Sequence, residues 1–244
     1  RKEATNTFNI PLIGSLDVNY KLFKWYAIGA NGSKNFRIPT YNDLYWEGLG
    51  NPNLLPETSY QISFNQFFKY KKSSLQLAAF YIDTKDMIKW TPDDSGKWQP
   101  QNFVNVKNQG IEATFKTTFQ YKKHQLNISG TYAYVKAIDQ ETDKQLIYVP
   151  LHKANGTISY NYKKITAFYE NVFTDAVFTD TENTRGILEY SISNIGVSYS
   201  LKFKKNNFKL SGRLNNILNK KYENVISRPM PNTTFLISIN YKYN

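Results

Sequence analysis

The stretch "TFLISINYKY", residues 234–243, alternates apolar and polar side chains along its length, with Leu236 as the exception. Its apolar positions are Phe235, Ile237, Ile239 and Tyr241, and the positions between them are Leu236, Ser238, Asn240 and Lys242. Successive side chains of a strand point to opposite faces of a sheet. This period of two therefore predicts a β-strand with one apolar and one polar face.

The same period recurs along most of the chain. Clear examples lie at residues 15–22, 60–65, 111–116, 126–134, 158–162 and 208–215, whereas residues 25–37, 74–90 and 164–178 alternate less cleanly. In residues 188–203 the alternation changes phase near Asn194, which predicts a β-bulge. About eleven strands are predicted, several of about 10–15 residues, which is longer than the roughly 5–6 residues usual in soluble sheets.

Short lysine-rich connections that follow an aromatic residue separate these strands in pairs. They are "FKYKKSS" (68–74), "FQYKKHQ" (119–125), "YNYKKIT" (160–166) and "KFKKNNF" (202–208), with "KLFKW" (21–25) as a shorter relative. Longer connections alternate with them at 38–56, 92–103, 139–149, 180–187 and 219–232. In an antiparallel up-and-down sheet, this alternation places the tight turns at one end and the long loops at the other.

Composition excludes several classes of site. The chain has 31 Lys and Arg against 19 Asp and Glu, a net charge of +12, and it has no Cys, so disulfides and zinc–thiolate sites are excluded. His124 and His152 have no carboxylate at metal-ligand spacing on a shared helix. We therefore expect no catalytic residue, no metal site and no cofactor.

The pattern favours a membrane β-barrel. The longest apolar run, "LAAFYI" (77–82), is far shorter than the roughly 20 residues of a transmembrane helix, whereas a tilted transmembrane strand needs only about 9–11. Aromatic residues near strand ends suit the two membrane interfaces, and a neighbouring lysine can extend its ammonium among lipid head groups. Alternation and turns also describe soluble sandwiches and propellers, so this alternative stays open on the pattern alone.

Four segments resemble one protein family, and they occur in that family's order. "FRIPTYNDLYW" (36–46) followed by "GNPNLLPE" (50–57) resembles a signature of the C-terminal half of TonB-dependent outer-membrane receptors. The other segments are "IKWTPDDSGKWQPQNFVNVKNQGIEAT" (88–114) with its Asn-x-Gly-x-Glu run at Asn108, Gly110 and Glu112, "LNNILNKKYENV" (214–225) and "RPMPNTTFLISINYKY" (228–243). Together they span residues 36–243, and their sequences are most similar to the cobalamin- and siderophore-receptor branch of Bacteroidetes-like proteomes.

The resemblance implies an all-β fold, an antiparallel up-and-down transmembrane β-barrel. Residues 1–244 would form its C-terminal portion, about eleven of roughly 22 strands. The N-terminal plug and the first half of the barrel are then expected to be absent from this chain. Because a half barrel would expose unpaired strand edges to lipid, the remaining barrel half is an expected partner.

The resemblance also implies a function. The expected activity is TonB-dependent uptake of a scarce, bulky nutrient, cobalamin or an iron–siderophore, across the outer membrane of a Gram-negative cell, with no enzymatic step. The expected partners are outer-membrane lipid, the TonB complex through the N-terminal part, the plug and the small-molecule nutrient, and no nucleic acid.

Ligand-binding residues are expected in the outer loops. Residues 36–56 would form one of these loops, restricted by prolines and rich in aromatic residues. The candidates for ligand contact are Tyr41, Tyr45, Trp46, Trp90 and Trp98. The alternative is that Phe36, Tyr41 and Tyr45 only pack against neighbouring loops.

Other functions stay open at this point. A passive porin-like barrel would share the strand pattern, and a barrel hydrolase would need a Ser/His/Asp constellation or paired carboxylates, for which no pattern is recognisable. A net charge of +12 permits a soluble basic β-rich binding protein, for example for nucleic acid. The lysines gather in turns and do not form a stripe along a strand face, which disfavours this alternative.

Overall fold

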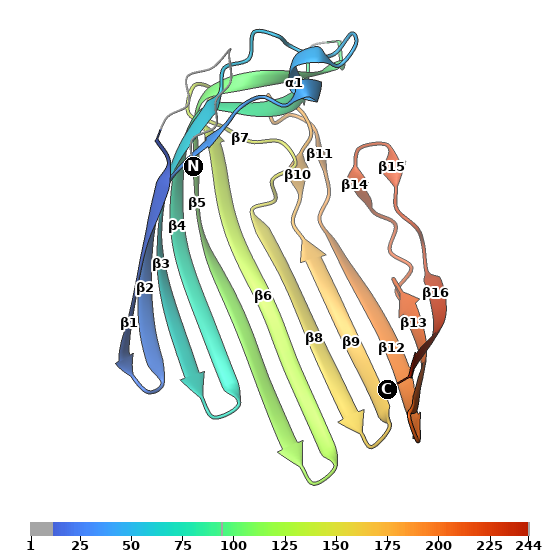
Figure 1. The fold of residues 1–244 in the computed structure, drawn as a ribbon. Coiled ribbons are helices and arrows are strands. Elements are labelled where there is room, and N and C mark those ends of the chain that lie inside the picture. Colours follow the sequence, from blue (N-terminus) through green and yellow to red (C-terminus); the bar gives the residue numbers. More distant parts are fainter. Residues whose placement is uncertain (1–11, 94, 244) are drawn as a thin grey trace.

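The computed structural model describes residues 12–93 and 95–243, and almost all of them belong to one curved antiparallel sheet (Figure 1). Its eleven long strands are β1 (Gly14–Phe23), β2 (Tyr26–Arg37), β3 (Glu57–Tyr70), β4 (Ser73–Pro92), β5 (Trp98–Tyr121), β6 (His124–Asp139), β8 (His152–Tyr162), β9 (Ile165–Thr174), β12 (Tyr190–Phe203), β13 (Asn206–Asn215) and β16 (Thr234–Tyr243). Each strand from β2 to β13 in this series pairs with its predecessor and its successor among the long strands. The predicted up-and-down order and the number of strands are confirmed.

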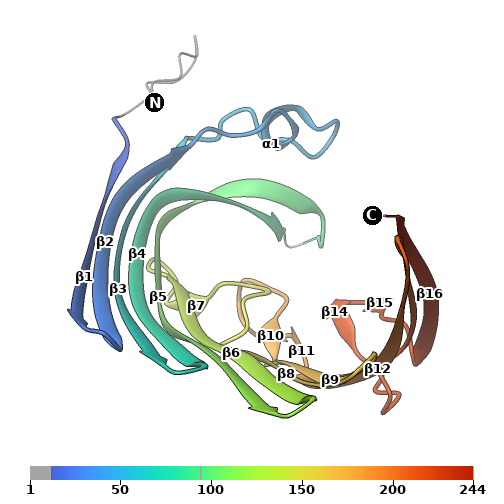
Figure 2. The ribbon, with the colours of Figure 1, turned by 60° about the horizontal axis from the view of Figure 1, so that its bottom comes forward.

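The sheet curves into an open wall (Figure 2). Among the described residues, β1 pairs only with β2, and β16 pairs only with β13, so these eleven strands do not close on themselves. Five short elements lie in the long connections: β7 (Lys144–Gln145), β10 (Val177–Phe178), β11 (Gly186–Ile187), β14 (Glu223–Val225) and β15 (Arg228–Pro229). The fold is therefore an open, curved wall with small loop structures on one end.

The two faces of the wall differ as the alternation predicts. Cross-strand partners share a face, and Phe64 pairs with Ala30 on one side and Ala79 on the other, in a row that continues to Ile111. The exposed apolar side chains of this face include Val18, Tyr20, Ile62, Phe115, Ile158, Tyr169, Val197, Leu210, Ile237 and Ile239. The loops fold onto the opposite, concave face (Figure 2), so the apolar face is the outer one.

The concave face is mostly polar and carries the small buried core. Val106, Ala137 and Leu146 form this core, and the amide of Leu146 donates to the carbonyl oxygen of Ala137 at 2.8 Å. Farther along the wall, Arg213 Nη2 donates to Glu170 Oε2 at 2.7 Å. Polar side chains on this face therefore satisfy one another across strands, as expected for the inside of a barrel.

Five tight turns connect neighbouring strands at one end, and the four that follow β3, β5, β8 and β12 have the same unusual backbone. Each of these four consists of two lysines, and the first lysine has a positive φ: 51° at Lys71, 52° at Lys122, 52° at Lys163 and 51° at Lys204. This left-handed region costs a residue with a side chain about 1–2 kcal/mol and favours glycine or asparagine. The predicted tight turns are confirmed, with lysine at positions that the backbone alone would not select.

The long connections lie at the other end, where one of them differs from its prediction. The prediction of a loop at 92–103 is wrong in its extent, because β4 continues to Pro92 and β5 begins at Trp98. Pairing continues from Lys85 with Asn105 to Pro92 with Trp98. The β4–β5 hairpin consequently extends beyond its neighbours and bends over the concave side (Figure 2).

The prediction of a bulge near Asn194 is wrong. Strand β12 pairs with β9 without a register shift from Tyr190 to Tyr199. The alternation changes because the concave face is partly buried here, so it carries the apolar Ile192 as well as the polar Asn194. Asn194 Nδ2 donates to Glu170 Oε2 at 3.0 Å. On the outer face, Ser193 Oγ accepts a hydrogen bond from Asn171.

Among the residues that the structure describes, no helix has both the length and the apolar character needed to cross a bilayer.

Candidate functional site

The loop 38–56 contains α1 (Tyr41–Tyr45), and its sequence explains where this helix begins. Thr40 precedes the helix and accepts a hydrogen bond from the amide of Asp43 at 3.2 Å, while Asp43 Oδ2 accepts one from the amide of Thr40 at 2.8 Å. This reciprocal capping box satisfies two amides at the start of the helix. A five-residue helix is marginal by itself, so its stability depends on contacts with the wall.

Asp43 provides the main contact between α1 and the wall. The residue is only 6% exposed, and its Oδ1 atom accepts a hydrogen bond from Trp90 Nε1 of β4 at 2.8 Å. Burial alone would raise the pKa of the carboxyl, but hydrogen bonds from Thr40 and Trp90 and the charge of Arg37 hold this pKa below its ordinary value. Asp43 is therefore charged at neutral pH and bonded to both the loop and the wall.

A second set of contacts ties the start and the end of this loop to β4. Arg37 Nη2 donates to Glu57 Oε2 and to the carbonyl oxygen of Ile88, both at 2.8 Å. The amide of Ile88 donates to the same Glu57 oxygen at 3.0 Å. Because Arg37 ends β2 and Glu57 begins β3, both ends of loop 38–56 are held against the β4–β5 hairpin.

All five aromatic residues predicted to contact ligand lie at the long-loop end, but the structure divides them into three groups. Trp46 and Trp90 pack edge to face with ring centroids 5.9 Å apart, and Tyr41 and Tyr45 form a tilted pair at 5.1 Å. Trp98 packs on Tyr148 at 6.1 Å. Their contact with a ligand stays a prediction.

The two tyrosines are the most available of these rings. Tyr41 is 76% exposed and Tyr45 58% exposed, whereas the indole nitrogen of Trp90 is already bonded to Asp43. Tyrosine offers a flat apolar surface and a hydroxyl group at low entropic cost, which suits the recognition of a large ligand. Trp90 contributes to the position of the loop, and the tyrosine pair forms part of the loop's accessible surface, beside the 53% exposed Trp46.

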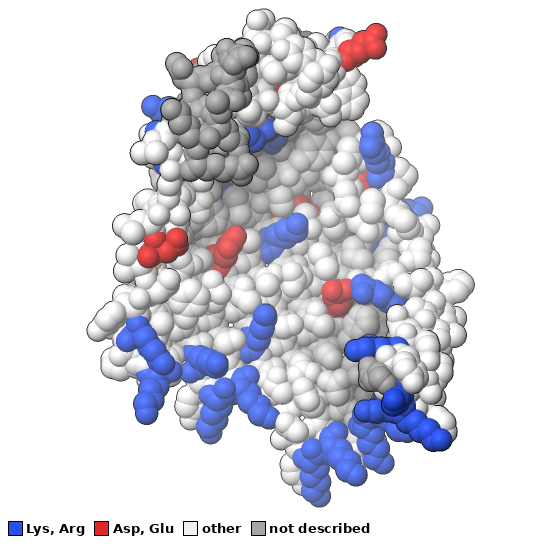
Figure 3. All heavy atoms as spheres, viewed as in Figure 1, with Lys and Arg blue, Asp and Glu red and all other residues white. Residues whose placement is uncertain are grey.

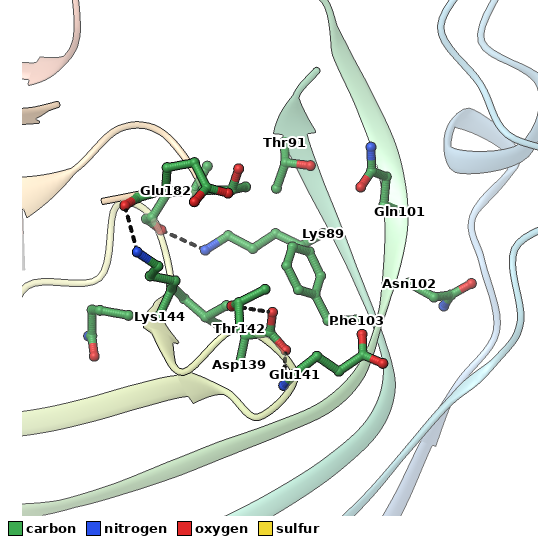
Figure 4. Close-up of a pocket in the computed structure, with 14 residues that line it drawn as sticks. Lys89, Thr91, Gln101, Asn102, Phe103, Asp139, Glu141, Thr142, Lys144 and Glu182 are labelled. Atoms are coloured by element: carbon green, nitrogen blue, oxygen red, sulfur yellow. Dashed lines mark hydrogen bonds between the residues drawn. The ribbon is translucent and has the colours of Figure 1, made fainter. Parts of the chain in front are cut away.

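A pocket that sequence reasoning did not predict lies beneath the β4–β5 hairpin (Figure 4). It is lined by Lys89, Thr91, Gln101, Asn102, Phe103, Asp139, Glu141, Thr142, Lys144, Gln145, Leu146, Ile147, Thr181 and Glu182. Its volume of about 240 Å³ is below the roughly 300–1,000 Å³ of typical small-molecule pockets. The pocket is therefore suited to one chemical group of a larger ligand.

Hydrogen bonds within the described residues hold the walls of this pocket. Lys89 Nζ donates to the carbonyl oxygen of Ile147 at 2.6 Å, and Lys144 Nζ donates to that of Glu182 at 3.1 Å. Thr142 Oγ1 donates to Asp139 Oδ2 at 2.7 Å. These bonds join β4 to the β6–β8 and β9–β12 connections. The pocket is therefore built from segments that are far apart in the sequence and share no sequence motif.

Lys89 makes the stability of this pocket depend on pH. Burial lowers the pKa of its amine from 10.5 to about 8, because an ammonium group loses hydration there. The charged form consequently destabilises the folded pocket below pH 8, and this penalty fades as pH rises from about 8 to 10.5.

We expect the rate of Lys89 acetylation by acetic anhydride to rise with pH and to level off above about pH 8. Peptide mass spectrometry after brief labelling measures this rate residue by residue, with Lys89→Met as the control for peptide assignment. An anion bound in the pocket would favour the ammonium form and move the midpoint upward. A rate that still rises steeply above pH 10 would contradict the expected pKa.

Comparisons with known proteins agree with the fold and with the order of the sequence segments. The sequence matches the family described as "TonB dependent receptor-like, beta-barrel" over residues 4–217. The vitamin B12 transporter BtuB of Photobacterium profundum is 28% identical over 249 residues, covering 100% of this chain and 40% of that protein. The vitamin B12 transporter BtuB of Vibrio vulnificus strain YJ016 is 38% identical over 117 residues, covering 46% of this chain and 18% of that protein.

Solved structures have the same fold at low sequence identity. The copper transporter OprC superimposes with a TM-score of 0.77 at 16% identity, covering 93% of this chain and 39% of that one. The siderophore receptor PirA from Acinetobacter baumannii superimposes with a TM-score of 0.71 at 15% identity, covering 94% and 40%. The chain thus spans about two fifths of the length of the first relative and of both structures.

Proposed function

Because this chain belongs to the TonB-dependent receptor β-barrel family, we propose that it forms the C-terminal part of the wall of an outer-membrane receptor that imports a scarce, bulky nutrient. The observation that carries the proposal is the eleven-stranded antiparallel wall, with an apolar outer face, tight turns at one end and folded loops at the other. Cobalamin and iron–siderophores are the two substrate classes. The relatives named for vitamin B12 transport and for siderophore reception support both.

The proposed placement in the membrane follows from the two faces and the two ends of the wall. The apolar outer face contacts the hydrocarbon core, and the polar concave face lines the lumen. In outer-membrane barrels short turns lie in the periplasm and long loops outside the cell. The tight lysine turns are therefore periplasmic, and α1 and the β4–β5 hairpin face the exterior.

We propose that further strands of the same receptor pair with β1 and β16. Each exposed strand edge carries unpaired backbone amides and carbonyls, and each such group costs several kcal/mol in hydrocarbon. The family implies a plug inside the completed barrel and a segment that binds TonB. In this receptor the chain forms the wall and the binding loops, and it catalyses no covalent change.

Energy dependence distinguishes this function from that of a passive porin. Cells that produce the receptor carrying this chain are expected to accumulate radiolabelled cobalamin or ferric siderophore only when TonB is present and the inner membrane is energised. Growth rescue with each nutrient separates the two substrate classes. Uptake that persists in a strain without TonB and after addition of a protonophore would support the porin alternative.

Substitution of Tyr41 and Tyr45 tests whether this pair forms part of the proposed binding surface. Replacing Tyr41 and Tyr45 together by alanine is expected to weaken nutrient binding to the purified receptor about tenfold, because each ring contributes roughly 0.5–1.5 kcal/mol at a contact. Tyr60→Ala is the matched control, because Tyr60 is 51% exposed and lies on a strand of the wall. Equal affinities of the double variant and the control would show that the pair does not contact the ligand.

A further inference from the structure

The positive charge of this chain is concentrated at the tight turns. The segments 18–28, 66–78, 114–128, 158–168, 198–210 and 238–243 contain fifteen lysines and none of the 19 acidic residues. The rest of the chain has 16 Lys and Arg against those 19 Asp and Glu, so the net charge of +12 originates at the turn end. Lysine and arginine atoms accordingly gather along the lower edge in Figure 3.

The turn lysines are arranged on aromatic rings in a repeated way. The Nζ atom of the first lysine lies over the ring of the residue before it: 5.2 Å from the centroid in Lys71–Tyr70, 5.3 Å in Lys122–Tyr121, 5.1 Å in Lys163–Tyr162 and 5.8 Å in Lys204–Phe203. All four lysines occupy a backbone conformation that favours glycine or asparagine. The repeat therefore places an ammonium group over an aromatic ring at each of these four turns, although the backbone conformation disfavours lysine.

An open groove lies on the outer face between two of these turns, bounded by the β3–β4 turn and by the ends of β5 and β6. Lys71 and Lys72 lie at its rim, and Lys72 Nζ donates to Gln120 Oε1 at 2.7 Å. Deeper, the hydroxyl groups of Ser73 and Thr117 are 2.7 Å apart. The walls are largely apolar and include Phe119, Leu126 and Tyr121.

We propose that this groove binds one anionic phospholipid of the leaflet that surrounds the tight turns. The phosphate contacts the ammonium group of Lys71, the glycerol region lies near the hydroxyls of Ser73 and Thr117, and the acyl chains continue over the apolar outer face at Phe115, two residues farther from the turn. Away from the β3–β4 turn, the lysines are followed by the paired Ser73 and Thr117 and then by the paired Leu75 and Phe115, which is the order of charged, polar and apolar groups in a phospholipid. The proposal rests on the proposed membrane placement and is independent of the transported nutrient.

The surrounding lysines explain why the occupant is anionic. Juxtamembrane lysines attract acidic lipids over distances within a Debye length, so the rim raises the local concentration of these lipids. A zwitterionic lipid gains little from this field, because its head group has no net charge. The groove then selects one lipid from the enriched layer through its contacts with Lys71, Ser73 and Thr117.

Native mass spectrometry of the whole receptor that carries this chain tests the site. The receptor is reconstituted in nanodiscs of phosphatidylcholine and phosphatidylglycerol in equal amounts and then released in mild detergent. We expect phosphatidylglycerol to be retained about tenfold more than phosphatidylcholine, and the preference to disappear in the Lys71→Asn, Lys72→Asn double variant. Asparagine accommodates a positive φ, so the turn itself is preserved.

The matched control is Lys204→Asn with Lys205→Asn, which removes the same charge from a turn outside the groove. It is expected to keep most of the preference, and millimolar inorganic phosphate is expected not to displace the lipid. Equal loss in both double variants, or displacement by phosphate, would overturn the specific site. A receptor that does not enter nanodiscs at all would instead refute the membrane placement, so the two failures are distinguishable.

Discussion

Replacing Gly110 by valine is expected to prevent assembly of the receptor wall. Gly110 lies inside β5, paired with Phe80 of β4 and Val135 of β6. A Cβ atom at this position would collide with the carbonyl oxygen of Tyr134 and lie 2.8 Å from Phe80 Cζ. Because one obstacle is backbone, a side-chain rotation does not relieve the clash, and β5 must separate from β6.

The expected cost exceeds the roughly 1–3 kcal/mol of ordinary overpacking, because ladder hydrogen bonds are lost as well. The measurement is the amount of heat-modifiable, folded receptor in the outer-membrane fraction, which should fall at least about tenfold. Gly212→Val is the matched control, because nothing lies within 4 Å of a Cβ at Gly212 on strand β13. Normal accumulation of the Gly110→Val variant would contradict the close approach of β5 and β6.

Replacing Asp43 by alanine is expected to release α1 from the wall while the strands still assemble. The change leaves Trp90 Nε1 and the amide of Thr40 without their acceptor and removes the negative charge 3.9 Å from Arg37. Removing one partner of a buried charged network costs about 3–5 kcal/mol. A five-residue helix does not stay in place after such a loss.

Two measurements separate this effect from misfolding. Nutrient uptake is expected to fall at least about tenfold, and limited proteolysis within residues 38–56 to become rapid, while the amount of folded receptor is unchanged. Glu47→Ala is the matched control, because Glu47 has the same charge, lies in the same loop and is exposed. Slow proteolysis in the Asp43→Ala variant would show that other contacts suffice to hold the loop.

The same carboxylate sets the acid limit of this loop. Because the folded-state pKa of Asp43 lies below 3.8, its stabilising contribution is present above that pH and is lost as pH falls through the lower folded-state value. The loop is consequently expected to stay docked in mildly acidic surroundings.

The architecture could be predicted from the sequence because its causes are local. Alternation such as Phe235, Ile237 and Ile239 reports which face of a strand is apolar, and an aromatic–Lys–Lys repeat reports where a strand pair turns. Both signals depend on neighbouring residues only. They predicted the up-and-down order, the separation of turns from loops and the number of long strands, which the structure confirms.

Features that depend on distant segments could not be predicted in this way. The pocket around Lys89 exists because the β6–β8 connection folds beneath β4, and the lysine itself looks like an ordinary strand residue in "IKWTP". The phase change near Asn194 was interpreted as a change in backbone, although the cause is the burial of Ile192 on the concave face. In both places the environment of a side chain is set by residues that are distant from it in the sequence.

The strict chain order of the long strands has an evolutionary consequence. Within the sheet, each hairpin pairs only with the hairpins before and after it, so neighbouring units share one seam of backbone bonds besides the contacts between their loops. Recombination between two such genes within a tight turn would exchange complete hairpins and leave every remaining seam intact. Loop repertoires can then be shuffled among descendants without rebuilding the scaffold beneath them.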